Sequence, residues 1–286
     1  MLTYLCTTFS VHGNLTSFAL TMLSGNMPFT PGVTTTETHG LLFVIAGQSL
    51  CVVRHSAPTV PRGDAGDALY LGDLDGQPCF ARLLGDGPPP AGSEPAPLRQ
   101  LFSELAEEEF AIATRALGLT AWDQDFRFCG RCGAPTERSA TERMRSCPSC
   151  KFTAYPRLSP AVIVLVERDG KCLLARNART RMPFYSTLAG FVEVGETLEQ
   201  CVAREIREEA GIELADIHYF GSQPWPFTSS LMIGFTATWA GGEIVAEPSE
   251  IFDADWFAPD AIPVVPPKLS IARALIDDFV QRHTRS

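Results

Sequence analysis

Three glutamates, Glu205, Glu208 and Glu209, are the residues of this 286-residue chain best placed to do chemistry. In a helix, where each residue turns by about 100°, their side chains fall within an arc of roughly 100° on one face. Three carboxylates on one partly buried face repel each other and are costly to desolvate unless cations lie between them. Oxygen ligands of this kind suit Mg²⁺ or Mn²⁺, and these cations suit phosphate substrates.

The helix that would carry these carboxylates has defined ends in the sequence. Thr197 and Gln200 form a capping box, which predicts a helix that begins at Leu198 and ends at Gly211. Glu196, in the loop just before this helix, is within reach of the same site. Three aliphatic residues lie alongside the carboxylates and would bury the helix: Leu198, Val202 and Ile206.

Four cysteines form a second candidate metal site. They make two Cys-x2-Cys pairs separated by 14 residues, each with a Gly or Pro beside it that turns two sulfurs toward one point: Cys129, Cys132, Cys147 and Cys150. Four thiolates complete the tetrahedral coordination of Zn²⁺ and leave no position open for water. We therefore predict one zinc ion per chain with a structural role.

Charge is distributed unevenly along the chain. The formal net charge is −10, yet residues 127–157 contain seven basic and two acidic residues, which gives this segment +5 and the rest −15. The excess of acidic residues outside this segment disfavours bulk, non-specific binding to nucleic acid or to anionic membrane. The basic segment is either an ordinary solvated surface or a place where phosphates bind.

Cysteine usage and hydropathy indicate a cytoplasmic protein. Nine cysteines is an odd number, and four have metal-ligand spacing, which is typical of a reducing compartment. The longest apolar runs, such as 161–166, are far shorter than the ~20 residues that cross a bilayer, so we expect no membrane partner. Residues 1–26 fit neither a signal nor a transit peptide, and we interpret them as a disordered tail or a misplaced start.

The elements that must position these residues can be predicted coarsely. Strands and a hairpin are expected between residues 41 and 82, followed by a loop or linker over 85–97 and a helix over 98–117 that Gly118 ends. A hairpin is expected around Asp169-Gly170, and a last helix that Ser270 caps. No chemistry is visible in the first 120 residues.

The carboxylate helix and its flanks match, over Gly190 to Ile212, the pattern G-x5-E-x7-R-E-U-x-E-E-x-G-U, where U is a bulky aliphatic residue. This segment resembles the Nudix box of the Nudix hydrolases. The resemblance implies an α/β (α+β) fold: an α/β/α sandwich with a mixed sheet over 157–286, a zinc ribbon over 121–156 and a β-rich N-terminal domain over 27–120. It also implies hydrolysis of a nucleoside diphosphate linked to another moiety.

Three further features resemble the NADH pyrophosphatase, or NudC-like, subfamily. Residues 222–230, SQPWPFTSS, are similar to its SQPWPFPxS signature, except for Thr228, which we expect to loosen the loop. The four-cysteine ribbon lies just upstream, and Tyr155-Pro156-Arg157 leads into the first strand. The resemblance implies hydrolysis of NADH or NAD⁺ to nicotinamide mononucleotide, reduced or oxidised, and AMP. Some members of this subfamily also remove NAD caps from RNA.

The resemblance also implies roles for individual residues. The resemblance makes Glu209 the principal catalytic carboxylate. Helical geometry does not single it out, since that geometry places Glu205 in the middle of the face. Arg204 is grouped with the catalytic residues, and we expect it to pair with a box carboxylate and fix its rotamer. The Mg²⁺ or Mn²⁺ ligands are Glu205, Glu208, Glu209 and Glu250. The residues lining the substrate pocket are Tyr155, Ala189, Phe191, Gln223, Trp225, Ser230 and Ala272. Members of the family are homodimers.

Two alternatives remain open at this point. In the first, the protein is a Nudix hydrolase whose substrate is another nucleoside diphosphate derivative such as ADP-ribose. In the second, it is a zinc-ribbon binding protein with an inactive Nudix domain. The intact glutamates of the box argue against the second alternative. Phe191 and Trp225 favour a dinucleotide, because flat rings stack on aromatic side chains and a cationic nicotinamide gains further over such a ring.

Overall fold

The computed structural model describes residues 28–178 and 183–284, which belong to two compact units. One unit contains Val162–Gly221 and residues 233–284, and the other contains residues 28–161 and Ser222–Met232. The segment 1–26, interpreted above as a tail or misplaced start, lies outside the described residues. Within the described ranges, no helix has the length and apolar character needed to cross a membrane.

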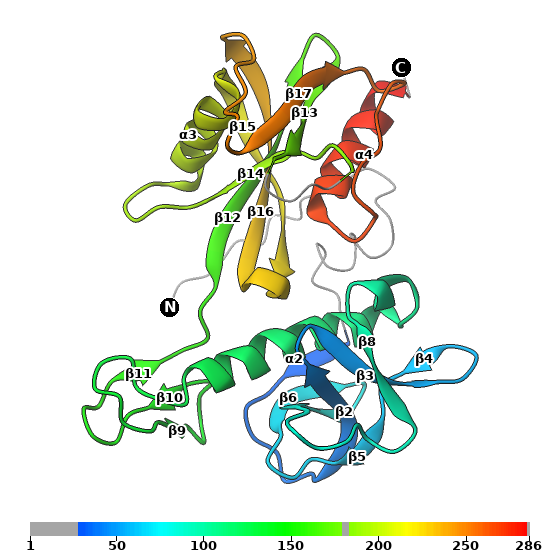
Figure 1. Ribbon diagram of the computed structural model, residues 1–286, viewed down its shortest axis with the longest axis vertical. Helices are drawn as coiled ribbons and strands as arrows, with labels where there is room; N and C mark the ends of the chain where they lie inside the picture. The colour runs from blue at the N-terminus through cyan, green and yellow to red at the C-terminus, as the bar shows by residue number, and fades with distance from the viewer. Residues whose placement is uncertain (1–27, 179–182, 285–286) are drawn as a thin grey trace, which may run out of the picture. The chain divides into compact units, whose positions relative to one another are not determined.

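The N-terminal part is a mixed sheet of eight strands (Figure 1). The strands are β1 (Phe29–Pro31), β2 (His39–Ala46), β3 (Ser49–Arg54), β4 (Pro58–Thr59), β5 (Arg62–Asp64), β6 (Leu69–Leu74), β7 (Gln77–Leu83) and β8 (Ser93–Pro97). Their order is β1-β6-β7-β2-β3-β4, with β5 on β2 and β8 on β3, and β2 runs parallel to β7. The predicted hairpin is β6–β7, whose turn residues Asp75 and Gly76 both have positive φ, as tight hairpin turns require.

Strand β8 corrects the prediction of a loop over 85–97. Its residues pair with β3 in antiparallel register, and Ala96 is buried. Prolines made this segment look irregular. A strand that pairs on one side only can include them, because the missing N–H groups are not needed on the unpaired side.

The helix of this unit also differs from its prediction. A short 3-10 turn, η1 (Gln100–Ser103), comes first, and α2 (Glu107–Asp125) then continues past Gly118. A glycine inside a helix costs about 1 kcal/mol relative to alanine. Leu119 and Trp122 are buried beyond it. Burial of each such side chain stabilises by about 1.5–3 kcal/mol, so packing outweighs the glycine.

The zinc ribbon is a small antiparallel sheet fixed to α2. It consists of β9 (Glu137–Arg138), β10 (Arg145–Ser146) and β11 (Thr153–Ala154) in the order β11-β10-β9. Asp123 of α2 pairs with Arg138 at 2.6 Å and with Arg145 at 2.5 Å. The Asp123 side chain is 13% exposed, so solvent has little access to it. The two ion pairs hold the ribbon on the helix.

The other unit is built on a six-stranded sheet. Its strands are β12 (Ser159–Arg168), β13 (Lys171–Asn177), β14 (Leu188–Phe191), β15 (Glu213–Trp225), β16 (Ser230–Gly241) and β17 (Ile251–Phe257), in the order β15-β16-β12-β13-β17 with β14 on β12. The helices α3 (Leu198–Ala210) and α4 (Ile271–Thr284) flank opposite sides of this sheet (Figure 1). The predicted hairpin at Asp169-Gly170 and the Ser270 cap of α4 are both confirmed. The α/β/α fold class is confirmed as well.

Candidate active site and metal centre

Helix α3 is held at a fixed rotation by its cap and its buried face. The side chain of Thr197 accepts a hydrogen bond from the backbone N–H of Gln200 at 3.2 Å, and the Gln200 side chain accepts one from the N–H of Thr197 at 2.8 Å. Gly211, with φ of 73°, ends the helix in the left-handed conformation. Val202 and Ile206 are fully buried. Both predicted ends are therefore confirmed, and the carboxylates of α3 have a defined direction.

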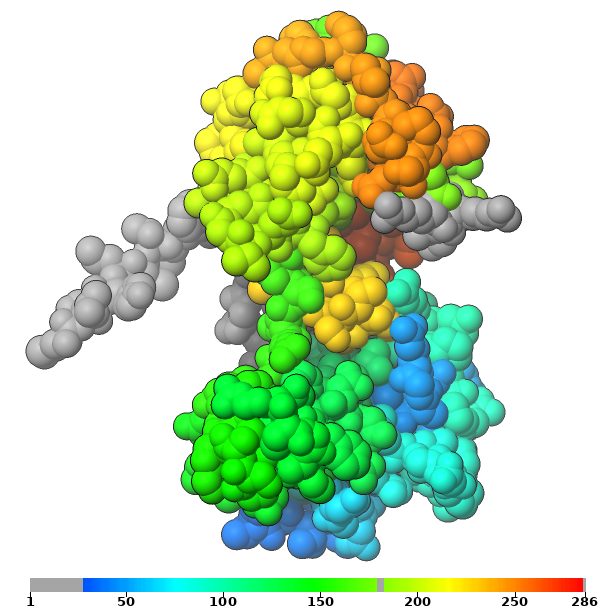
Figure 2. All heavy atoms as spheres, turned by 60° about the vertical axis from the view of Figure 1, so that its left-hand side comes forward, coloured from blue at the N-terminus to red at the C-terminus, as the bar shows by residue number. Residues whose placement is uncertain are grey.

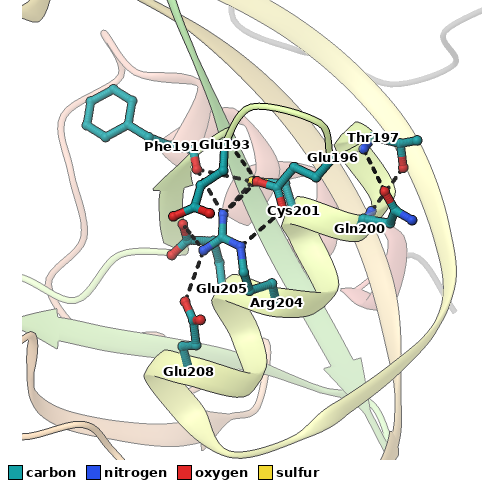
Figure 3. A network of polar contacts seen from close by, with 9 residues as sticks. All are labelled: Phe191, Glu193, Glu196, Thr197, Gln200, Cys201, Arg204, Glu205 and Glu208. Carbon is teal, nitrogen blue, oxygen red and sulfur yellow. Dashed lines mark hydrogen bonds and ion pairs between the residues drawn. The ribbon is translucent and has the colours of Figure 1, made fainter.

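Arg204 lies at the centre of the carboxylate face (Figure 3). It pairs with a box carboxylate as predicted, and its guanidinium in fact donates to three: Glu196 at 2.7 Å, Glu205 at 2.9 Å and Glu208 at 2.9 Å. It also donates to the backbone carbonyl of Phe191 at 3.0 Å. The hydrogen bond from Arg204 lowers the pKa of Glu196 to about 2. Arg204 thus neutralises charge that would otherwise repel and fixes the rotamers around it.

Glu205 is largely buried, with a side chain 13% exposed against 60% for Glu208. Burial raises its pKa, Arg204 opposes that rise, and the negative charges of Glu208 and Glu250 add to it. A cation that binds here would relieve both the burial cost and the repulsion. The oxygen donors of these residues fit a hard divalent metal.

Gly190 is the box residue whose purpose sequence reasoning did not identify. A Cβ atom at this position would lie 1.8 Å from Cδ of Glu205 and 2.1 Å from its oxygens. Any side chain at residue 190 would therefore displace the Glu205 carboxylate. Its place as the first fixed residue of the box motif was a signal in the sequence that a glycine is needed here. The reason for the glycine is visible only in the packing against Glu205.

Glu250 reaches this face because the loop before β17 is fastened to the end of α3. The N–H of Glu247 donates to the backbone carbonyl of Glu209 at 3.0 Å, and the N–H of Val245 donates to that of Ala210 at 2.9 Å. The N–H of Ala178 donates to the carbonyl of Glu250 at 2.7 Å. The side chain of Glu209 is itself buried, since the residue is 6% exposed. The structure therefore brings an acidic residue from a distant part of the sequence to the box helix.

The four cysteines converge as predicted. Their sulfurs all lie within 4.8 Å of one another, with Sγ–Sγ distances of 3.6 Å for Cys129–Cys150 and 3.5 Å for Cys132–Cys147. Sulfurs about 2.3 Å from a tetrahedral zinc ion are about 3.8 Å apart, so the quartet fits zinc closely. A backbone N–H of Cys150 that donates to Cys147 lowers the pKa of that thiol to about 6. Among the described residues, no other set of three or more Cys, His, Asp or Glu side chains brings its ligand atoms this close.

The residues assigned to the substrate pocket differ in exposure. In the unit with the box helix, Phe191 is 56% exposed, whereas Ala272 is buried and Ala189 is exposed. In the other unit, Tyr155 is exposed and its hydroxyl donates to Glu142. Gln223 and Ser230 there are buried. Among the residues assigned to the pocket, Phe191 and Tyr155 are thus the most exposed aromatic side chains.

Trp225 has partners that the sequence did not indicate. Its ring lies 5.1 Å from that of Phe227 in an edge-on arrangement, and the guanidinium of Arg99 lies 5.3 Å and 4.2 Å from the two ring centres. The Gln48 side chain donates to the carbonyl of Phe227 at 3.4 Å. Residues before 120, in which no chemistry was visible, therefore hold the Trp225 loop.

Thr228, the residue that departs from the subfamily signature, lies in a short turn. Residues Pro226–Thr228 form a 3-10 turn, η2, and the hydroxyl of Thr228 lies 2.9 Å from that of Ser230. The N–H of Ser229 donates to the carbonyl of Pro226 and closes the turn, and the hydroxyl pair is a contact that proline could not form.

Comparison with known proteins agrees with this geometry. The sequence matches the NUDIX domain over residues 156–279, the NADH pyrophosphatase zinc ribbon domain over 124–152, and the NADH pyrophosphatase-like rudimentary NUDIX domain over 36–122. It is 47% identical to the NAD-capped RNA hydrolase NudC of Stutzerimonas stutzeri, over 74% of this chain and 77% of that protein. It is 42% identical to the protein of the same name from Deinococcus radiodurans, over 83% of this chain and 86% of that one. This chain therefore belongs to the Nudix hydrolase family, in its NADH pyrophosphatase branch.

Proposed function

We propose that this protein is a metal-dependent diphosphatase that hydrolyses the pyrophosphate bond of NADH, NAD⁺ and the NAD cap of RNA. The products are nicotinamide mononucleotide, reduced or oxidised, and AMP or an RNA that begins with a monophosphate. The observation that carries this proposal is the buried Glu205 carboxylate, which lies against Gly190 and feels the charges of Glu208 and Glu250. The zinc ribbon and the NudC relatives support the choice of substrate.

Four side chains would hold the divalent metal, which we propose is Mg²⁺ or Mn²⁺: Glu205, Glu208, Glu209 and Glu250. When bound, the metal supplies polarisation of a phosphoryl oxygen and a lowered pKa of the attacking water. Among these glutamates, Glu209 is the principal catalytic carboxylate, a role that we assign by family resemblance. Arg204 keeps Glu205 and Glu208 in their rotamers through the hydrogen bonds described above. The zinc site has four protein ligands and takes no part in this chemistry.

The exposed ring of Phe191 offers a face on which the nicotinamide stacks. We retain as proposed substrate contacts the residues assigned by resemblance: Tyr155, Ala189, Phe191, Gln223, Trp225, Ser230 and Ala272. Family resemblance also supports a homodimer. Free zinc-binding thiols support a reducing, cytoplasmic location.

The proposal is tested by measuring kcat/KM for NAD-capped RNA, NADH, NAD⁺ and ADP-ribose, each with Mg²⁺ and with Mn²⁺. We expect the nicotinamide substrates to exceed ADP-ribose by about tenfold or more, which corresponds to about 1.4 kcal/mol of preferential binding in the transition state. Preference for ADP-ribose would assign a different substrate. Failure to hydrolyse any of the four would identify an inactive Nudix domain.

A further inference from the structure

The basic residues of the zinc ribbon separate into two groups once the structure is considered. Three are engaged in polar contacts with the protein: Arg138 and Arg145 pair with Asp123, and Arg143 donates to the carbonyls of Gly32 and Tyr70. Four others are exposed, and within the described ranges none of them forms an ion pair: Arg127, Arg131, Lys151 and Arg157. The positive charge noted in the sequence is therefore partly structural and partly free on the surface.

Aromatic rings lie among the free cations. The guanidinium of Arg131 lies 5.0 Å from the centre of the Phe152 ring, and that of Arg157 lies 4.8 Å from the centre of the Phe126 ring. Phe128 is 63% exposed, although it directly precedes the first zinc ligand. Cations that follow a sugar-phosphate backbone, together with rings on which bases stack, are the two components of single-stranded nucleic acid sites.

Lys151 has a backbone conformation that is unusual for a lysine. Its N–H donates to the carbonyl of Cys147, just as the N–H of Gly133 donates to the carbonyl of Cys129, so the two residues occupy equivalent turns. Both have positive φ, 75° for Gly133 and 61° for Lys151. Glycine adopts this conformation freely, whereas a lysine is strained in it. The turn itself therefore does not explain why a long, charged side chain stands at residue 151.

We infer that the outer face of the ribbon binds single-stranded RNA. We define this face as Arg127, Phe128, Arg131, Lys151, Phe152 and Arg157. Figure 2 shows the atoms of the ribbon, in green, as a broad continuous surface. A segment of charge +5 on a chain whose remaining residues sum to −15 is complementary to a polyanion, and it is where phosphates would concentrate. The inference rests on the proposed function, because the bound RNA is the chain that follows the NAD cap.

The first experiment measures binding of an uncapped, single-stranded RNA by fluorescence anisotropy at several salt concentrations. The test variant combines Arg127→Gln, Arg131→Gln and Lys151→Gly, and the control combines Lys171→Gln with Arg62→Gln on exposed strand residues elsewhere. Each lost phosphate contact lowers the slope of log Kd against log salt by about 0.7, so the test variant should lose about 2. Its affinity at low salt should fall by roughly tenfold to a hundredfold, while the control changes little. An unchanged slope in the test variant would overturn the inference.

Folding is checked with the single substitution Lys151→Gly. Relief of the strained conformation should leave the melting temperature unchanged or higher, with one zinc per chain, while RNA binding weakens. Phe128→Ala should weaken RNA binding by about fivefold or more, and Phe128→Tyr should restore it, because stacking needs only a flat ring. Equal affinity for duplex RNA, or no effect of Phe128→Ala, would contradict a single-strand site.

The second experiment separates this inference from the proposed function. The triple variant should lose about tenfold or more in kcat/KM for NAD-capped RNA and keep its kcat/KM for free NADH. If the wild-type protein hydrolyses no dinucleotide but its RNA binding depends on these residues, the proposed function fails and the RNA site stands. If capped RNA and NADH respond equally to the triple substitution, the outer face of the ribbon is not an RNA site.

Discussion

The zinc site and the carboxylate face use opposite ways to assemble a set of ligands. The cysteine sulfurs all lie within 4.8 Å of one another because two short backbone turns direct them. The carboxylates come from α3 and from the loop before β17, and Arg204 holds three of the acidic side chains. A site determined by local backbone is complete by itself, whereas a site assembled from distant elements depends on charge balance.

The difference in construction fits the different roles of the two sites, which are structural at the zinc site and catalytic at the carboxylate face. A quartet of thiolates that satisfies its metal fully stabilises a small sheet with little core of its own. On the carboxylate face, burial and, to a smaller extent, the neighbouring carboxylates raise the pKa of Glu205, so this face has a reason to take up a cation with its substrate. Loss of a residue should therefore damage folding at the first site and turnover at the second. The following predictions test that contrast.

Cys129→Ser should have the largest effect, and it should be on stability. Zinc binding to such sites contributes roughly 10–16 kcal/mol, much of which is folding free energy of the ribbon. Metal analysis should find well below one zinc per chain, together with a clear drop in melting temperature. Cys172→Ala, which removes a buried thiol outside the quartet, is the control and should keep its zinc. A Cys129→Ser protein with full zinc content and unchanged melting temperature would refute a structural zinc site.

Glu209→Gln should affect turnover and leave the fold intact. It preserves the shape of the side chain but removes a metal-binding charge, so kcat should fall by about 10² or more. Binding of NADH should change much less, as measured by calorimetry. Glu199→Gln, on the same helix but exposed in its first turn, provides the comparison and should stay near wild-type kcat. Near wild-type turnover in Glu209→Gln would show that the metal-site assignment is wrong.

Gly190→Ala should reduce turnover through Glu205 alone. The added methyl group must displace the Glu205 carboxylate, and a misplacement of about 1 Å can cost up to about 10²-fold in rate. Gly241→Ala is the matched control, because a Cβ there meets no atom within 4 Å. We expect a lower kcat, a weaker response to added Mg²⁺ and unchanged zinc content for Gly190→Ala. Equal kcat in the two alanine variants would mean that the position of Glu205 does not limit the reaction.

Phe191→Ala should have the smallest effect, and it should fall on substrate choice. Loss of one stacking face costs about 0.5–1.5 kcal/mol beyond buried area. The preference for NADH over ADP-ribose should therefore fall by roughly three- to tenfold, since about 1.4 kcal/mol is a factor of ten. Tyr219→Ala removes another exposed ring of the same unit and should not change the ratio. An unchanged ratio in Phe191→Ala would remove this ring from the recognition scheme.

Features determined by neighbouring residues could be predicted from the sequence. The Thr197–Gln200 box, the Gly211 end of α3 and the convergence of the cysteines all follow from short-range geometry. Features that depend on distant contacts could not be predicted. Helix α2 passes Gly118 because of tertiary burial, and β8 exists because β3 is available to pair with it.

The same distinction applies within the candidate site. The spacing of the glutamates on α3 could be predicted, but the triple pairing of Arg204 depends on how the preceding loop folds back. The contact of Arg99 with Trp225 joins residues more than a hundred positions apart, and the part of the chain around Arg99 carried no motif. Motifs indicate which residues act, and packing determines which residues hold them in place.

The central claim is that the carboxylate face of α3 acts on a pyrophosphate bond, and product identification tests it most directly. Wild-type protein should be incubated with NADH and Mg²⁺ or Mn²⁺, and the products separated by chromatography and identified by mass spectrometry. Because a divalent metal held by the carboxylates would stabilise the negative charge that develops on phosphoryl oxygens, we predict reduced nicotinamide mononucleotide and AMP in equal amounts, with none formed in chelator. Free nicotinamide together with ADP-ribose would contradict the account, because that cleavage breaks a glycosidic bond and leaves the pyrophosphate intact.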